Sequence, residues 1–506
     1  MPSTSLRPPL RIVRQGQIIT LHGVPADRTL LQVLREDLHC TAVKEGCASG
    51  DCGACTVTLA ERTENGRLRW HAINSCIRLA HSVDGMALWT AQDIAAPDGS
   101  LHPVQQALVQ HHGSQCGFCT PGFVMSLFTL YQQRSTSGPA LTATTPITRD
   151  EALHALSGNL CRCTGYRPIL DAAQALHQWP VPPGNETDLL QKLELLARYG
   201  QAQMPDLANE PADSFYARPP TLAQLLALHA AYPQAQIVAG ATDVGLWITK
   251  QHRRFAQVID VTRVAELRHI TRTDTPTGSA LRIGAAVSLN DAFAALAQDR
   301  PALQAFFHRF AGQPVRTSGT LGGNVANGSP IGDSMPLLIA LGATLVLASP
   351  RGQRQLPIED FYLAYRQTAL APDEVLAAID VPLPTASEHV CAYKVSKRQE
   401  DDISAVCLAV ALRVEGGVIA HARIGAGGVA AIPARAIKTE ASLVHQTCAN
   451  AVFESAAQVL QGEFEPMSDM RASAAYRRQV LGQLLLRCGD ELQASPEPSL
   501  SRLQPV

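Results

Sequence analysis

The sequence predicts a multidomain α+β protein. Its 506 residues are too many for one hydrophobic core. Two proline-bearing polar stretches, "WPVPPGNE" (179–186) and "MPDLANEPAD" (204–213), separate a cysteine-rich first part from the rest. Strand-like and helix-like patterns occur on both sides of them. We therefore expect domains at 1–94, 95–178, 213–385 and 386–506, with a linker at 179–212.

Composition excludes several classes of function. The formal net charge of -2 argues against the broad basic surface of a nucleic-acid-binding protein. The N-terminal "MPSTSLRPPLRIVRQGQ" lacks the apolar core of a secretory signal, and "MPLLIALGATLVLA" (335–348) is too short to span a bilayer. We expect a cytoplasmic protein without a membrane segment, and in that reducing compartment its 13 cysteines are hard to explain as disulfides. Eight of them lie in the first third of the chain as two sets of four, whereas the other five are scattered singly: Cys40, Cys391, Cys407, Cys448 and Cys488.

Residues 1–94 contain the first set of spaced cysteines. "LRIVRQGQIITLHGVP" alternates like a hairpin, "RTLLQVLREDL" has helical spacing, and "CTVTLAE" and "RLRWHAINSC" are strand-like. Between them, "KEGCASGDCGACTV" has the C-x4-C-x2-C spacing of a plant-type ferredoxin loop, which predicts a 2Fe-2S cluster. Its glycines allow the tight turns that such a loop needs. The ligands would be Cys47, Cys52, Cys55 and Cys76.

Residues 95–178 contain a second set, in "QCGFCTPGF" and "GNLCRCTGYRPI". Pro121 and Pro168 suit the first turns of helices, and Thr148 with Glu151 forms a capping box, so helices should converge on these cysteines. The ligands would be Cys116, Cys119, Cys161 and Cys163. The alternative at both sets is zinc, which also takes four thiolates, and a zinc-binding assembly module is the corresponding non-enzymatic function.

These three motifs together resemble the iron-sulfur part of the xanthine oxidase family of molybdenum hydroxylases. The resemblance implies one 2Fe-2S cluster in a ferredoxin-like β-grasp domain and another in a four-helix domain, the second lying nearer a molybdenum centre. It also implies that Gln115 stands where the family has a glutamine in contact with the pterin.

Residues 213–385 carry two glycine-bearing stretches. "AQIVAGATDVGLWI" is a strand that enters a turn able to offer N-H groups to phosphate, although such turns are often only turns. "FAGQPVRTSGTLGGNVANGSPIGDS" (310–334) is a long loop of small polar residues. Together they resemble the FAD-binding domain that this family shares with vanillyl-alcohol-oxidase-type flavoproteins.

The resemblance continues into 386–506, where "YKVSKRQEDDISAV" (393–406) matches the start of the family's α+β C-terminal flavoprotein domain. "GAGGVA" (425–430) superficially fits a nicotinamide fingerprint, but Pro433 would interrupt the required helix, so a structural turn is the better interpretation. Core packing is the alternative for Phe310. The implied FAD contacts are Val238, Ala239, Gly240, Ala241, Thr242, Asp243, Val244, Phe310, Thr320, Gly323, Asn324, Asn327, Asp333, Leu376 and Lys394.

The domain order resembles the iron-sulfur and FAD-binding small subunit of bacterial two-subunit xanthine dehydrogenases. This implies electron transfer from molybdopterin on a large subunit, through two 2Fe-2S clusters and FAD, to NAD, during oxidation of hypoxanthine or xanthine to urate. No residue of this chain would act directly on the purine, and two small and two large subunits would form a heterotetramer. Another heteroaromatic or aldehyde substrate is the alternative.

Overall fold

The computed structural model describes residues 8–136, 145–179, 186–200, 213–276, 278–399 and 401–493. The proline-bearing stretches expected as linker lie largely outside these residues. The chain forms two compact units. The first comprises Met1–Arg268, Ser288–Asp291 and Ala311–Gly323, and the second comprises His269–Val287, Ala292–Phe310 and Asn324–Val506. Within the described ranges, no helix has the length and apolar character needed to cross a membrane.

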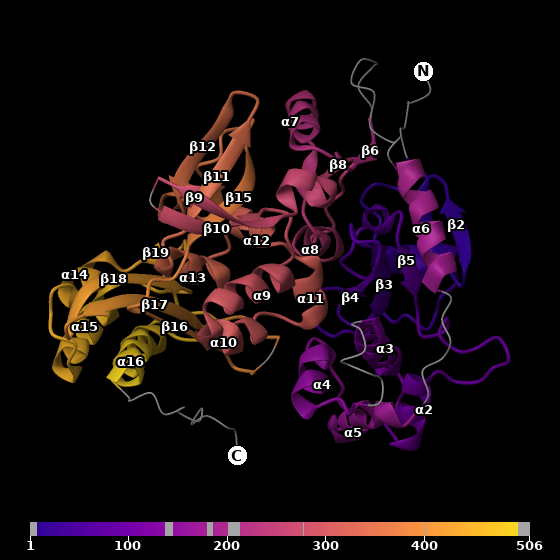
Figure 1. The fold of residues 1–506 in the computed structure, drawn as a ribbon, viewed down its shortest axis with the longest axis horizontal. Helices are drawn as coiled ribbons and strands as arrows, with labels where there is room; N and C mark the ends of the chain where they lie inside the picture. Colours follow the sequence, from indigo (N-terminus) through magenta and orange to yellow (C-terminus); the bar gives the residue numbers. More distant parts are fainter. Residues whose placement is uncertain are drawn as a thin grey trace. The chain divides into compact units, whose positions relative to one another are not determined.

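The first unit begins with a mixed five-stranded sheet of order β2-β1-β5-β3-β4 (Figure 1). β1 and β5 are parallel, and the other neighbours are antiparallel. Thr29 and Gln32 form a capping box where the helix begins. The elements are β1 (Leu10–Arg14), β2 (Gln17–Leu21), α1 (Leu30–Gln32), the π-helical turn η1 (Val33–Asp37), β3 (Thr56–Arg62), β4 (Leu68–Asn74), the 3-10 turn η2 (Ala80–Val83) and β5 (Ala87–Trp89).

Four helices follow: α3 packs against β3 and β4, α2 and α4 contact α3, and α5 contacts α2 and α4. Phe123, Phe128 and Leu170 from the helices share a buried core with Trp70 and Ala60 from the strands. The expected capping box between Thr148 and Glu151 is present. The helices are α2 (Pro103–Gln110), α3 (Thr120–Thr136), α4 (Arg149–Leu156) and α5 (Arg167–Ala175), with η4 (Leu176–Gln178) after them; α6 (Glu186–Gly200), from the expected linker, contacts β1 and β3.

The rest of the first unit contains a parallel three-stranded sheet of order β6-β8-β7. The "AGATD" turn lies between β7 and α8, as the sequence predicts. The elements are β6 (Phe215–Ala217), α7 (Leu222–Ala231), β7 (Gln236–Val238), α8 (Val244–Thr249), β8 (Gln257–Asp260), η5 (Val261–Arg263), η6 (Ala265–Leu267) and α11 (Gln313–Ser318).

The second unit contains an antiparallel sheet of order β12-β11-β15-β10-β9. Its helices α9 and α12 also contain residues of the first unit. The elements are β9 (Ile270–Thr275), β10 (Gly278–Gly284), α9 (Leu289–Asp299), η7 (Pro301–Leu303), α10 (Gln304–His308), α12 (Leu321–Asn327), α13 (Ser334–Ala340), β11 (Thr344–Ser349), β12 (Gly352–Pro357), η8 (Ile358–Asp360), β13 (Tyr362–Ala364), β14 (Gln367–Thr368) and β15 (Val375–Pro382).

A second antiparallel sheet, of order β16-β17-β18-β19, ends the second unit. Leu408, Val410 and Ile424 on its strands share a core with Phe453 and Leu481 on the helices. α13 contacts β17 and β18, and the backbone of Gly425 approaches so closely that a Cβ there would lie 2.0 Å from the Pro336 carbonyl. The elements are β16 (Glu388–Val395), β17 (Val406–Glu415), β18 (Val418–Gly427), β19 (Ala434–Arg435), α14 (Ile437–Leu443), α15 (Asn450–Glu463) and α16 (Ala474–Gln493) (Figure 1).

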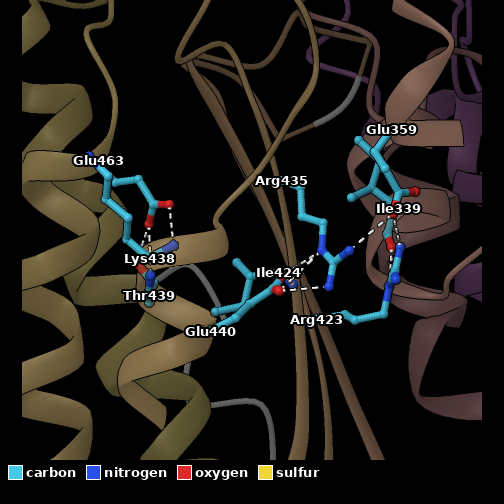
Figure 2. Close-up of polar contacts among 9 residues, drawn as sticks. All are labelled: Ile339, Glu359, Arg423, Ile424, Arg435, Lys438, Thr439, Glu440 and Glu463. Atoms are coloured by element: carbon cyan, nitrogen blue, oxygen red, sulfur yellow. Dashed lines mark hydrogen bonds and ion pairs between the residues drawn. The ribbon is translucent and has the colours of Figure 1, made fainter. Parts of the chain in front are cut away.

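Charged side chains connect these layers. Figure 2 shows Arg423 of β18 bound both to Glu359, at 2.7 Å, and to the Ile339 carbonyl, at 3.1 Å. Arg435 pairs with the same Glu359 and with Glu440 of α14. Glu440 also accepts the Ile424 N-H at 2.8 Å. One network therefore fixes α14, β18 and η8 within the second unit.

Candidate cofactor sites

The first cysteine loop turns through backbone conformations that suit glycine. Gly50 and Gly53 have φ values of +82° and +68°. A Cβ on Gly53 would lie 2.4 Å from the Gly158 carbonyl, so this position is closed to larger residues by packing as well as by φ. The loop is thus held tightly around its cysteines.

The four thiols of this loop form a chain of contacts. Cys47 contacts both Cys52 and Cys76, and Cys76 contacts Cys55. Hydrogen bonds from Cys52 and Cys76 lower the pKa of Cys47, and the bond from Cys76 lowers the pKa of Cys55. The N-H groups of Ser49 and Cys52 point at the Cys47 sulfur, each at 3.4 Å. These donors favour thiolate at Cys47.

The second set is arranged as two contacting pairs, Cys119 with Cys161 and Cys116 with Cys163. Burial raises the pKa of Cys119 to about 12. Burial also opposes the Cys161 thiolate, but hydrogen bonds from Thr164 outweigh it and lower the pKa of that thiol. The Thr164 hydroxyl donates to the Cys161 sulfur at 3.2 Å. The set is less protected than the first, because Cys116 and Cys163 are exposed.

The distances between the cysteine sulfurs distinguish a zinc ion from a 2Fe-2S cluster. A zinc ion with 2.3 Å Zn-S bonds holds all four sulfurs within about 4 Å of one another. Within the described part of the chain, no three of these eight sulfurs lie mutually within 4.8 Å. A binuclear cluster takes two thiolates at each iron, which is compatible with pairwise contacts. The donor sets therefore fit 2Fe-2S clusters better than single zinc ions.

The two cysteine loops are bonded directly to each other. The Leu160 N-H donates to the Cys52 carbonyl at 3.0 Å. The buried Asn159 amide donates to the Gly53 carbonyl at 3.3 Å and its oxygen accepts the Ser126 hydroxyl at 2.6 Å. A single hydrogen bond, from Leu160 to Cys52, thus joins the backbone of one cysteine set to the residue next to Cys161 of the other.

The first glycine-bearing turn, Val238–Val244, lies against residues 318–323 in the first unit. Gly240 and Ala241 have φ values of +98° and +62°, and a Cβ on Gly240 would lie 1.9 Å from the Ser318 carbonyl. The Gly323 N-H donates to the Thr320 hydroxyl at 2.9 Å, and a Cβ on Gly323 would lie 3.5 Å from the Ala239 carbonyl. This cradle of backbone groups suits a diphosphate.

Helix α8 joins this turn to the first cysteine loop. The Thr249 hydroxyl donates to the Ala48 carbonyl at 2.7 Å, and the Lys250 ammonium donates to the Cys47 carbonyl. A Cβ on Gly245 would lie 2.3 Å from the carbonyl of Ile77, the residue after Cys76. The helix therefore lies directly on the cysteine loop.

The remaining predicted FAD contacts belong to the second unit. Asp333 and Lys394 form a buried ion pair at 2.9 Å, and Asp333 also accepts the Ser404 hydroxyl. Asn324 accepts the Ser334 hydroxyl, and Phe310 packs edge-on against Phe293, with ring centroids 5.1 Å apart. Leu376 is buried on β15, and Asn327 ends α12 half-buried.

Sequence comparisons match consecutive parts of the chain. Residues 12–80 match the 2Fe-2S iron-sulfur cluster binding domain, and residues 90–174 match the 2Fe-2S binding domain. Residues 210–384 match the FAD binding domain in molybdopterin dehydrogenase, and residues 391–492 match the CO dehydrogenase flavoprotein C-terminal domain. The chain belongs to the xanthine oxidase family of molybdenum hydroxylases.

Relatives of this chain include xanthine dehydrogenases. That of Drosophila subobscura is 33% identical over 93% of this chain, and that of Oryza sativa subsp. japonica is 33% identical over 83% of it. The matches span 38% and 35% of those two proteins. Among solved structures, the carbon monoxide dehydrogenase of Hydrogenophaga pseudoflava matches 55% of this chain and 96% of its own, with 30% identity and a TM-score of 0.51.

Several residues that support the sites were not predicted from the sequence. Tyr166, whose hydroxyl accepts the Cys161 N-H at 3.0 Å, and Thr164 were visible beside the cysteines in "CRCTGY". Asn159 and Lys250 had no local signal, because their partners lie far away in the sequence.

Proposed function

We propose that this chain is the electron-transfer part of a xanthine dehydrogenase. In this proposal Cys47, Cys52, Cys55 and Cys76 ligate one 2Fe-2S cluster, and Cys116, Cys119, Cys161 and Cys163 ligate the other. The two glycine-bearing stretches and the buried pair of Asp333 and Lys394 bind FAD. The domains are 1–94, 95–178, 213–385 and 386–506, joined by the linker at 179–212.

One observation carries the proposal: the first cysteine loop contacts the second cysteine set on one side and α8 on the other. Leu160 bonds to Cys52, while Thr249 bonds to Ala48. α8 begins where the proposed FAD turn ends. The three proposed sites therefore follow one another through bonded segments, which is the arrangement that stepwise electron transfer needs.

When bound, the clusters would carry electrons singly, and FAD would collect two of them for delivery as a hydride to NAD. The protein's own groups set the environment. N-H donors from Ser49 and Cys52 stabilise negative charge at the Cys47 sulfur. Cys55 and Cys76, only 1% and 2% exposed, exclude water from their side of the loop.

The second cysteine set supports a partner that carries molybdopterin. Phe118, Leu160 and Tyr166 are 48%, 41% and 37% exposed beside the exposed Cys116 and Cys163. Large exposed apolar side chains around a proposed redox site suit a protein interface. Gln115, also exposed, would face the pterin there. We propose a large subunit at this surface and a heterotetramer of two small and two large subunits.

The proposed substrates are hypoxanthine and xanthine, with NAD as acceptor, because the full-length relatives are named xanthine dehydrogenases. A second candidate is another heteroaromatic compound. It is favoured by the quinoline 2-oxidoreductase of Pseudomonas putida 86, which matches 97% of its own chain and 56% of this one at 28% identity and a TM-score of 0.50.

The test uses the protein purified with its native partner. Iron, flavin and molybdenum are assayed, and xanthine and then NAD are added under argon while absorbance is followed. We expect about four irons and one flavin per chain, bleaching on xanthine addition and NADH formation. Bleaching by quinoline but not by xanthine would show that the substrate is a heteroaromatic compound other than xanthine. A chain that holds zinc in place of iron would overturn the proposal.

A further inference from the structure

A cluster of metal-ligating side chains lies in the C-terminal domain, remote in sequence from both cysteine sets. The nitrogen and sulfur atoms of His389, Cys391 and Cys488 all lie within 4.8 Å of one another. Along the sequence these two cysteines are isolated. The fold brings them together because β16 and α16 share the core of the second sheet.

The side-chain repeats of strand β16 and helix α16 place the proposed ligands on facing sides. His389 and Cys391 are two apart on β16, so their side chains project from the same face of the strand. Cys488 and Glu491 are three apart on α16, so they share one face of that helix. The two faces meet, with Cys391 Sγ 3.3 Å from His389 Nε2 and 3.5 Å from Glu491 Oε2.

We propose that His389, Cys391 and Cys488 bind one zinc ion, with the fourth position taken by an oxygen of water or of Glu491, whose Oε2 lies 3.5 Å from Cys391 Sγ. Two sulfurs, one imidazole nitrogen and one oxygen are donors that zinc accepts in a tetrahedral site. Adjacent ligand atoms in such a site lie about 3 to 4 Å apart, and the two Cys391 distances fall in that range. Binding releases the protons of the two thiols to solvent.

The proposed ligands are buried or half-buried and held in place by neighbouring side chains, as ligands of a structural metal site are. Cys391 and Cys488 are 6% and 0% exposed, whereas His389 is half-buried and leaves an entry path. Glu491 is fixed by Arg487, which donates to Oε1 at 2.7 Å, and by the Tyr393 hydroxyl, which donates to Oε2 at 2.7 Å. Such outer partners orient ligands and tune their affinity.

A zinc ion at this site would connect helix α16 to β16, the edge strand of the sheet. β16 pairs only with β17 along the described ladder, and α16 is the last described helix. A zinc bridge between them would stabilise the domain in the way that a cross-link does, without requiring an oxidising compartment.

The experiment measures zinc in the whole chain, purified with its partner after growth in zinc-supplemented medium. We expect about one zinc per chain, with zinc-edge X-ray absorption showing two sulfur and two nitrogen or oxygen neighbours. The element-specific edge separates this ion from iron and molybdenum. Four sulfur neighbours would instead locate the zinc in a cysteine loop and overturn the proposal.

Variants locate the ion. His389→Ala and Cys488→Ala should lose the zinc, whereas Cys448→Ala, a lone half-buried cysteine of the same domain, should keep it. Tyr393→Phe should weaken zinc binding by about 10- to 100-fold, as loss of an outer hydrogen bond does. Iron and flavin contents report whether each variant is folded.

Three results would overturn the proposal: wild-type protein without zinc after incubation with zinc chloride, zinc retained in both ligand variants, or a disulfide between Cys391 and Cys488 in peptides mapped under argon. Because His389 is half-buried, its alanine variant tests the site even where Cys488→Ala does not fold.

Discussion

At the scale of single residues, His102 links stability to pH. It is 7% exposed, and its Nδ1 accepts the Val104 N-H at the start of α2 at 3.2 Å. Burial lowers its pKa to about 4. The unfolded chain therefore takes up a proton before the folded chain does, and stability is lost as pH falls from about 6.5 toward 4.

His102→Asn keeps a helix-capping acceptor without this titration. We expect the wild type to lose about 2 kcal/mol more than the variant between pH 7 and pH 5. Thermal unfolding followed by tryptophan fluorescence measures this, since Trp70 and Trp89 contact the Phe128 ring beside His102. Parallel pH profiles for the two proteins would contradict it.

A second residue-scale prediction concerns the proposed FAD turn. Gly240→Ala combines a φ of +98° with a Cβ 1.9 Å from the Ser318 carbonyl, so the turn must move. We expect FAD to bind at least about tenfold more weakly, a loss of about 1.4 kcal/mol, as measured by flavin retained per iron. Gly23→Ala, with a φ of +69° and open space around it, is the matched control and should retain flavin.

The motif spacings indicated which cysteines form each set, although Cys76, Cys161 and Cys163 reach their partners only through the fold. They could not predict the gathering of His389, Cys391 and Cys488, since it depends on where α16 packs. The buried pair of Asp333 and Lys394 likewise joins residues from separate segments. The loops could be predicted from local sequence patterns, whereas these contacts depend on tertiary packing.

At the scale of elements, α14 begins without a capping side chain of its own. Its N-cap residue is Ala436, and Glu463 at the end of α15 instead accepts the Lys438 and Thr439 N-H groups at 2.7 and 3.0 Å (Figure 2). This substitute cap explains why the helix start carried no sequence signal.

Glu463→Ala should therefore destabilise α14 by about 1 kcal/mol. Hydrogen exchange of the α14 amides measures this locally, and we expect exchange to be about fivefold faster at its first turn. Glu465→Ala removes an exposed carboxylate nearby and should leave the exchange unchanged. Equal effects of the two substitutions would show that Glu463 acts by charge alone.

At the scale of the whole molecule, the compact units do not follow the order of the chain. Ala311–Gly323 belongs with the first unit, where a Cβ on Gly312 would lie 2.5 Å from the Gly158 Cα and the buried Arg316 donates to the Ser157 hydroxyl at 3.2 Å. The sequence predicted the α+β class and the kinds of domain, which the comparisons confirm. It could not predict this segment's placement, which depends on two distant glycines fitting together.

The route between sites is testable at this scale. Gly245→Ala places a Cβ 2.3 Å from the Ile77 carbonyl and should push α8 away from the first cysteine loop. We expect flavin reduction by substrate to slow on the order of tenfold, with iron and flavin contents unchanged, in stopped-flow absorbance. Gly462→Ala in α15 meets no atom within 4 Å and is the control. An unchanged rate of flavin reduction would show that electron transfer does not depend on the contact between α8 and the first cysteine loop.

The unequal burial of the two cysteine sets has a consequence for biogenesis. Cys55 and Cys76 are enclosed once the first unit has folded, whereas Cys116 and Cys163 still face solvent. A delivery protein could reach the second set on a finished fold, whereas Cys55 and Cys76 of the first set are accessible only before their loop closes. Maturation of this chain would then be ordered, with the inner site filled during folding and the outer site filled afterwards.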